Sequence, residues 1–292
     1  MASAAMNPAT RGPRRATPLP RRRLPTLVML APAVAALTLL FGGGLAGAVQ
    51  QSLHPTIDGS GPPELSAWRS VLRDPAFADA LQFSLQTTLL ATALSAAAAV
   101  AVAAALRRRG ALPRLLVALP VPVPHLLVAV VAVVWLGPGG LAERASGALP
   151  LQLVRDRAGL GVVLVYVYKE TPFLVLLLLA RMGRGLAQRE EAAAVLGAGH
   201  WQRLCWVVWP TIRAPLAGGA LIVAAFVLGA LEVPLTVGPS HPPTLATFAY
   251  DQPRLDLVAG QARAAAALLV AAAASIILGV GALRLARGVG RD

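Results

Sequence analysis

Three side chains that are charged at neutral pH lie within long apolar stretches of the 292-residue chain, namely Lys169, Glu170 and Glu232. A charge at the centre of a membrane helix costs about 2.5–3.5 kcal/mol on insertion scales, so such groups usually face the bundle interior or water. The functional hypothesis is that these groups, with the nearby Tyr166, line a path for a polar solute. The structural alternative is an ion pair between helices, such as one between Lys169 and Glu232.

Several other kinds of chemistry lack the residues that they need. A phosphate-binding Walker loop requires a Gly-Lys pair, but the only lysine, Lys169, follows Tyr168. A Gly-x-Ser-x-Gly nucleophile motif does not occur. The single cysteine, Cys205, excludes an internal disulfide, and the four histidines are too widely spaced to indicate a metal site. We therefore expect no catalytic residue and no metal, and energy for uphill transport must come from an ion gradient or another chain.

The composition points to a membrane protein, because 57% of residues are hydrophobic and only 13% are charged. Six apolar stretches exceed or approach the roughly 20 helical residues that cross a bilayer. They are residues 26–49, 84–106, 115–136, 160–180, 216–237 and 264–283. Since a lipid-exposed backbone must satisfy its own hydrogen bonds and these runs do not alternate like barrel strands, helix is expected.

We accordingly predict an all-α, polytopic membrane protein with six transmembrane helices. The transmembrane domain covers 26–283, basic tails occupy 1–25 and 284–292, and a loop at 181–215 joins the fourth and fifth spans. An alternative for the first span is a cleaved signal peptide ending near Ala46-Gly47-Ala48, but its apolar run is too long for a typical signal core.

The arginines indicate which side of the membrane each loop faces. Eighteen of them lie in the two tails and in the loops after the second and fourth spans, whereas seven lie in the remaining loops. Cytoplasmic loops carry the excess of basic residues, so both termini and the 181–215 loop are expected in the cytoplasm. The net charge of +13 then reflects topology, and we expect no nucleic-acid partner.

The third span contains three alternating prolines, Pro120, Pro122 and Pro124, which cannot continue a regular helix. One interpretation is a kink at the gate of the path, since broken helices are tolerated where backbone faces protein or a water-filled cavity. The other is that the helix begins only near His125.

The segment from Gln188 to Pro210 is expected to form two short helices on the cytoplasmic side. Its first part is rich in helix formers, and Gly197 and Gly199 offer the left-handed conformation that ends a helix. The second helix should stop before Pro210. Its apolar stripe at helical spacing consists of Trp201, Leu204, Cys205 and Val208. Taken alone, this pattern is typical of an amphipathic helix lying on the membrane.

The same segment resembles the EAA loop of ABC-transporter permeases of the binding-protein-dependent importer type. Glu191-Ala192-Ala193 is followed after three residues by Gly197 and after nine more by Val207-Val208-Trp209-Pro210. The family pattern is Glu-Ala-Ala, three residues, Gly, nine residues and Ile-x-Leu-Pro, so Val207 stands for Ile and Trp209 for Leu. The lead-in Asp74-Pro75-Ala76-Phe77 also resembles the stretch before this family's core helices.

The resemblance implies the fold of a type I ABC importer permease in the cell inner membrane. It implies that the loop docks on a cytoplasmic ABC ATPase dimer, with the contact made by Glu191, Ala192, Ala193, Gly197 and Pro210. ATP would be bound and hydrolysed by that partner, so this chain would be no enzyme and hold no cofactor. A second permease, identical or different, and an extracytoplasmic solute-binding protein complete the expected assembly in the lipid bilayer.

The solute is suggested by a fainter resemblance. Residues 229–239 resemble the corresponding segment of polyamine importers, and less closely that of importers of iron, thiamine or anions. Glu232 near the outer face would suit a cation. One rival hypothesis is a secondary transporter driven by an ion gradient through Glu232 and Glu170, for which inverted repeats would be expected but are not evident. A membrane-embedded transferase is a second rival, but it would need clustered acidic or histidine residues at one interface.

Overall fold

The computed structural model describes residues 24–56, 61–146 and 153–289, so most of the predicted basic tail at 1–25 and the last three residues of the one at 284–292 lie outside the described residues. Within these ranges the regular secondary structure is helical, without a strand. Six helical runs are long and apolar enough to cross a membrane. They are Val28–Leu53, Pro75–Leu106, His125–Ala145, Leu160–Arg181, His200–Gly229 and Gly260–Leu285. The predicted all-α architecture with six membrane helices is confirmed.

The chain divides into two compact units, Met1–Ala46 and Gly47–Asp292. In the first unit, α1 (Leu24–Leu37) continues through a π-helical turn, η1 (Thr38–Gly42), into α2 (Gly43–Leu53). The second half of α2 belongs to the second unit. Helix α2 runs without interruption through Ala46-Gly47-Ala48, the site considered for signal-peptide cleavage.

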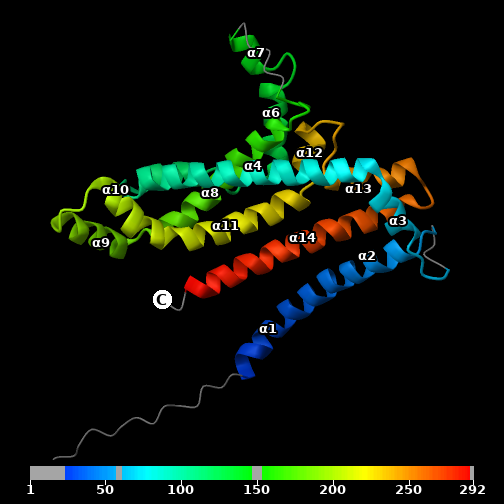
Figure 1. The fold of residues 1–292 in the computed structure, drawn as a ribbon, viewed down its shortest axis with the longest axis horizontal. Helices are drawn as coiled ribbons and strands as arrows, with labels where there is room; N and C mark the ends of the chain where they lie inside the picture. The colour runs from blue at the N-terminus through cyan, green and yellow to red at the C-terminus, as the bar shows by residue number, and fades with distance from the viewer. Residues whose placement is uncertain (1–23, 57–60, 147–152, 290–292) are drawn as a thin grey trace, which may run out of the picture. The chain divides into compact units, whose positions relative to one another are not determined.

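Four long helices form the frame of the second unit: α4 (Pro75–Leu106), α8 (Leu160–Arg181), α11 (Trp209–Gly229) and α14 (Gly260–Val289). Helix α4 packs along α8, and α11 packs along α14 while also contacting α8 and α4 (Figure 1). Between α8 and α11 the chain forms α9 (Arg184–Val195), α10 (His200–Arg203) and a second π-helical segment, η2 (Leu204–Val208).

Small residues allow these long helices to approach one another. One face of α4 carries a small residue at every fourth position, and all four members are completely buried: Ala91, Ser95, Ala99 and Ala103. Membrane helices associate through such small-residue faces because close backbone approach replaces the hydrophobic driving force that lipid does not supply. Larger side chains of α8, including Val162, Leu174 and Leu178, fill the core beside them.

Two helix boundaries differ from the predicted spans for identifiable reasons. Helix α4 begins at Pro75 rather than at residue 84, because Asp74 caps it by accepting a 2.9 Å hydrogen bond from the Ala76 amide. The fifth span ends at Gly229 rather than at residue 237, and the chain is extended at Ala230 before α12 (Glu232–Val237). Pro234 has no amide hydrogen to bond the Ala230 carbonyl four residues earlier, so α11 does not continue into this stretch, and Pro234 lies in the first turn of the separate helix α12.

The third span begins at His125, as the second interpretation of the prolines predicts. Helix α5 (Ala111–Ala118) ends before Pro120, the next residues form turns, and α6 (His125–Leu136) then leads to α7 (Leu141–Ser146). The span placed at 115–136 therefore begins about ten residues later, because the prolines cannot donate the amide hydrogen bonds that a helix requires.

The end of the unit at which α4 begins is closed by two short helices, α3 (Ser66–Arg73) and α13 (Leu245–Leu255). Their apolar side chains pack with Phe77 and with alanines of α14 in a second core cluster. Polar links hold the same elements together: Arg263 pairs with Asp74 at 2.8 Å, and the buried Ser84 hydroxyl accepts the Leu245 amide at 2.7 Å. In the turn before α14, the amides of Ala259 and Val258 donate to the Asp256 carboxylate and lower its pKa.

We predict that Gly161→Ala destabilises the protein. A Cβ at this second residue of α8 would collide with the backbone carbonyl oxygen of Leu153 and lie 2.9 Å from a methyl carbon of Val237. Overpacking of this kind costs about 1–3 kcal/mol, so the thermal midpoint of the detergent-purified protein should fall. The control is Gly279→Ala in α14, where an added Cβ meets no atom within 4 Å. Equal midpoints for the two variants would contradict this packing.

Candidate functional site

The segment predicted to form two short helices lies at the opposite end of α4 from α3 and α13. Helix α9 ends at Val195, and Gly197 adopts a left-handed conformation with φ of +85°, as the glycine pattern predicts. The amide of Gly199 donates to the Gln202 side chain at 2.8 Å as α10 begins. We call residues 184–210 the coupling segment below.

The helix does not stop before Pro210, so that prediction is wrong. Helicity is continuous from His200 to Gly229, with a π-helical turn at Leu204–Val208 directly before the proline. Pro210 lies in the first turn of α11, where its missing amide hydrogen is tolerated. A π turn carries one extra residue, so the residues of the predicted apolar stripe no longer share one face of the helix. Val208 is buried, whereas Trp201 is 73% exposed.

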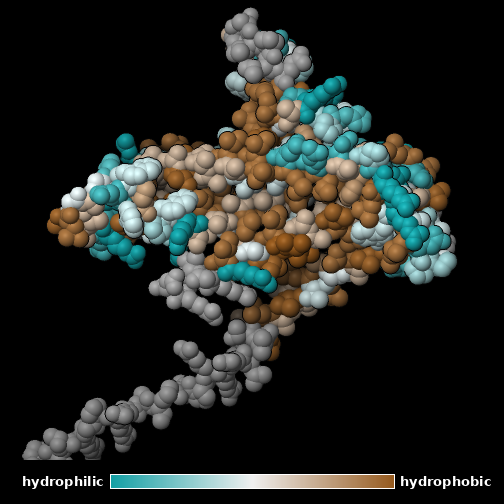
Figure 2. Space-filling model, viewed as in Figure 1, coloured by the Kyte–Doolittle hydropathy of each residue, from teal (hydrophilic) through white to brown (hydrophobic). Residues whose placement is uncertain are grey.

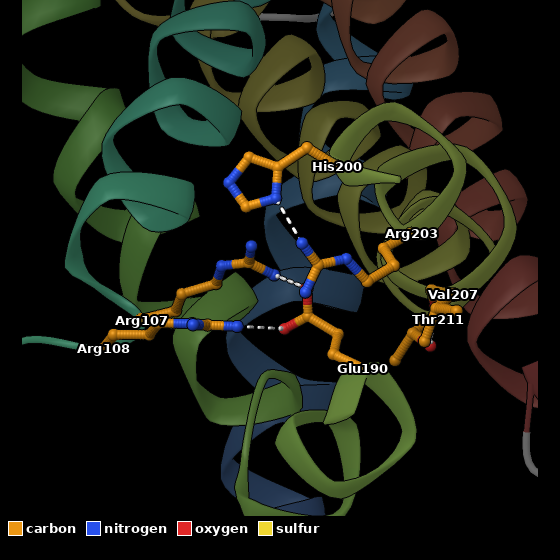
Figure 3. A network of polar contacts seen from close by, with 7 residues as sticks. All are labelled: Arg107, Arg108, Glu190, His200, Arg203, Val207 and Thr211. Carbon is orange, nitrogen blue, oxygen red and sulfur yellow. Dashed lines mark hydrogen bonds and ion pairs between the residues drawn. The ribbon is translucent and has the colours of Figure 1, made fainter. Parts of the chain in front are cut away.

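A buried carboxylate joins the coupling segment to α4. Glu190 of α9 accepts from Arg107 at 2.6 Å and lies 3.8 Å from Arg108, both at the end of α4 (Figure 3). Glu190 is only 3% exposed, so these arginines replace its hydration. The sequence reasoning missed this residue and selected its neighbour, Glu191. The three arginines at 107–109, predicted on the same side of the membrane, were the signal that one of the two glutamates would be paired.

Glu191 lies one residue further along α9 and is exposed, without a hydrogen bond or ion pair to any other described residue. Ala192, Gly197 and Pro210 are exposed as well, and Ala193 is half-buried. The residues of the EAA-like pattern therefore present their surfaces outward, whereas the adjacent Glu190 faces the protein.

A groove of about 350 Å³ lies between α9 and the π-helical turn. Its lining residues are Ala193, Leu196, Gly197, Ala198, Gln202, Arg203, Trp206 and Val207. Leu196 is 87% exposed and Trp206 is 80% exposed, which is unusual for large apolar side chains away from lipid. In Figure 2, apolar side chains lie among hydrophilic ones where α9 and α10 form one end of the second unit. Beside the groove, a guanidinium nitrogen of Arg203 lies 2.5 Å from Nδ1 of His200 (Figure 3).

Lys169 satisfies the backbone of the proline-broken segment. Its ammonium group, on the buried face of α8, donates to the carbonyl oxygens of Pro120 at 2.8 Å, Val121 at 3.2 Å and Val123 at 2.6 Å. These carbonyls lack helical partners because the prolines interrupt the amide pattern. Irregular backbone at membrane depth requires partners within the protein, and Lys169 supplies them.

The residue after Lys169 on α8, Glu170, contacts the start of α6, on the far side of the proline-broken segment. Glu170 lies 2.8 Å from the imidazole Nε2 of His125, the first residue of α6. The ring of Phe226 from α11 packs on His125 at 4.7 Å and on Tyr166 at 6.5 Å between ring centroids. The hydroxyl of the buried Tyr166 has no hydrogen-bond partner among the described residues.

The four residues proposed to line a path lie in two kinds of environment, and their role in a path stays a prediction. Tyr166, Lys169 and Glu170 are buried within the second unit. Glu232 is the exposed first residue of α12. Lys169 and Glu232 form no ion pair in the described part of the chain, so the pairing considered from sequence is wrong, because the free carbonyls provide Lys169 with closer partners.

We predict that Lys169→Met destabilises the protein by several kcal/mol. The substitution removes the donor of the Val121 and Val123 carbonyl oxygens, whereas the Pro120 carbonyl keeps a 3.3 Å hydrogen bond from the Val123 amide. Each carbonyl left unsatisfied costs about 1–3 kcal/mol. Thermal unfolding of the purified protein measures the loss. Tyr168→Phe, at the exposed neighbouring position, is the control and should leave the midpoint unchanged. A Lys169→Met protein with the parental midpoint would show that these bonds contribute nothing.

We predict that the Glu190–Arg107 pair can be reversed. Glu190→Arg and Arg107→Glu alone each bury uncompensated like charges and should lower the thermal midpoint, and the double variant should recover part of the loss. The recovery corresponds to a coupling energy of about 0.5–3 kcal/mol. Glu191→Ala, at the exposed neighbour, should change stability by less than about 0.5 kcal/mol. Strict additivity of the two single changes would refute the pairing.

Comparisons with known proteins agree with this architecture. The chain matches a family model described as the binding-protein-dependent transport system inner membrane component over residues 97–291. The Escherichia coli (strain K12) protein named "Inner membrane ABC transporter permease protein YnjC" is 29% identical over 220 residues. That match covers 73% of this chain and 43% of the relative, so the chain spans less than half the length of this relative.

Solved structures share the fold at low sequence identity. One is a bacterial ABC transporter involved in the import of the acidic polysaccharide alginate, with a TM-score of 0.70 and 17% identity over 90% of this chain and 96% of that one. Another is a bacterial alginate ABC transporter in complex with an alginate pentasaccharide-bound periplasmic protein, with a TM-score of 0.67 and 18% identity over 92% and 93%. The predicted importer-permease fold is confirmed, and the chain belongs to the family of binding-protein-dependent transport system inner membrane components.

Proposed function

We propose that this chain is a membrane-spanning permease subunit of an ATP-driven importer for a small polar solute. In this proposal the chain forms part of the solute path and couples to a separate cytoplasmic ABC ATPase through the coupling segment. The observation that carries the proposal is the outward presentation of Glu191, Ala192 and Gly197 beside an exposed apolar groove. A surface of this kind at the end of a membrane protein fits a partner protein rather than lipid or water.

The internal contacts of the coupling segment suit the transmission of force. The Glu190–Arg107 pair joins α9 to the end of α4, and helicity continues from α10 through η2 into α11. A displacement of the coupling segment by an ATPase would thus act on α4 and α11 together. Since α4 packs on α8 and α11 packs on α14, the motion reaches the four long helices of the second unit.

The expected partners follow the same proposal. Two ATPase subunits would bind ATP on the cytoplasmic side, and a second permease, identical or different, would complete the path. The connections assigned to the outer side are short, so a separate solute-binding protein would deliver the solute. Within this proposal the chain itself hydrolyses no ATP and holds no cofactor. A polyamine-like cation remains the prediction from residues 229–239, with Glu232 as the exposed carboxylate at the start of α12.

We predict that Glu191→Ala lowers both solute uptake and solute-stimulated ATP hydrolysis while membrane insertion is unchanged. Losing one member of a buried interfacial charge pair costs about 2–5 kcal/mol, which corresponds to a loss of about thirtyfold or more in ATPase binding. Reconstituted vesicles containing the permease, its ATPase and its binding protein measure both activities. Glu143→Ala, an exposed acid on α7, should leave both unchanged. A Glu191→Ala complex with parental uptake would remove this residue from the docking contact.

Gly197→Asp should impair coupling in the same assay. The substitution places a charge in the groove at a left-handed residue, whereas Gly197→Asn retains a side chain that tolerates this conformation without adding the charge. We expect Gly197→Asn to keep more activity than Gly197→Asp, and normal transport by Gly197→Asp would argue against the docking assignment.

ATPase pull-down should be lost when residues 188–202 are deleted. Uptake that needs no ATPase and stops with Glu232→Gln or Glu170→Gln would instead favour an ion-gradient-driven transporter.

A further inference from the structure

A large polar pocket lies at the end of α4 that is remote from the coupling segment. Its volume is about 560 Å³, within the range of small-molecule sites. The first turns of α4 form one wall, and the loop between α12 and α13 forms another (Figure 1). The lining residues are Ala76, Asp79, Gln82, Phe83, Gln86, Arg157, His241, Pro242 and Pro243.

The polar side chains of this pocket have no partners within the described part of the chain. None of the five forms a hydrogen bond or ion pair with another described residue: Asp79, Gln82, Gln86, Arg157 and His241. The pocket differs in this respect from the polar clusters around Lys169 and Glu190, which have their hydrogen-bond partners within the chain. Its donors and acceptors remain free for a ligand.

The polar side chains on this face of α4 are unsuited to contact with lipid. A helix of 32 residues is about 48 Å long, whereas the hydrocarbon core is about 30 Å thick. If the hydrocarbon ends near Leu106, before the arginines at 107–109, it reaches back about 20 residues along α4, to the level of Gln86. An unpaired amide there requires water or a polar ligand. Leu85 and Leu89, on the adjacent exposed face of α4, are the side chains suited to lipid.

The charges of the pocket indicate the class of ligand. Asp79 and Arg157 line the same cavity but form no ion pair with each other. A polycation would bind Asp79 and be repelled by Arg157, and a polyanion would meet the reverse problem. A solute with one group of each sign satisfies both residues, while Gln82 and Gln86 offer hydrogen bonds between them.

We propose that this pocket binds a small zwitterionic solute, with its ammonium group toward Asp79 and its carboxylate toward Arg157. The inference rests on the proposed transport function and names the solute class that this function would serve. It places the first contact of the solute with the permease at the outer end of α4. It also departs from the polyamine suggested by residues 229–239, so the two solute classes can be compared directly.

The test uses a thiol reporter in the full-length protein. Gln82→Cys is introduced into a Cys205→Ala background, and a membrane-impermeant maleimide is added to vesicles whose outer face is exposed. Labelling is repeated in the presence of four mixtures of solutes, each at millimolar concentration. The zwitterion pool contains the amino acids and glycine betaine, the cation pool putrescine and spermidine, the anion pool succinate and malate, and the neutral pool glucose and maltose. We expect the zwitterion pool to slow labelling about fivefold or more, because a pocket that is about 80% occupied leaves about one fifth of the thiols accessible. The other pools should have little effect.

Matched variants separate binding from access. Asp79→Asn or Arg157→Gln in the Gln82→Cys protein should each abolish protection by the zwitterion pool while labelling without solute stays fast. Leu85→Cys, on the lipid-suited face, should label slowly and show no protection. The proposal is overturned if a different pool protects, if no pool protects, or if the Gln82→Cys thiol is inaccessible because a second permease covers the pocket. Because no ATPase is present, these results are independent of the Glu191 and Gly197 coupling assays.

Discussion

Backbone carbonyl oxygens at membrane depth must find hydrogen-bond donors within the protein, and Lys169 meets this requirement at the one place where the prolines break the third span. Its ammonium group gathers three carbonyls of the segment between α5 and α6, and the adjacent Glu170 binds His125 at the start of α6. Helix α8 therefore serves as the internal support for its interrupted neighbour. The position of α6 and of the connections on either side of it depends on these two residues.

The ends of the bundle are held by a different kind of contact. Ion pairs lie at both ends of α4: Glu190 with Arg107 at one end, and Asp74 with Arg263 at the other. Between them the helices approach through small residues such as Ala91 and Ala99. Apolar surfaces between helices can slide because they lack directional bonds, whereas the terminal pairs fix the register. A membrane protein whose ends are fixed in this way can transmit a displacement at one end along the length of its helices.

The sequence was sufficient for features that depend on local patterns. Apolar length predicted six membrane helices, and Gly197 was recognised as the end of α9. Features that depend on tertiary contacts were not accessible. Nothing local distinguishes Glu190 from Glu191, because only the packing of α9 against the end of α4 decides which carboxylate is buried. Likewise, Pro210 was expected to end a helix, but a π turn before it and its place in the first turn of α11 allow the helix to continue.

The buried charges show why a charged residue in an apolar run does not by itself identify a solute path. Lys169 and Glu170 are candidates because charge is costly in a membrane, and in the structure both have partners within the chain, so their place on a solute path stays a prediction. Side chains with unsatisfied hydrogen-bonding capacity also occur elsewhere, among them the less conspicuous amides Gln82 and Gln86 near the start of α4. Charge in an apolar run and free hydrogen-bonding capacity are therefore separate properties, and the second depends on tertiary contacts that the sequence does not show.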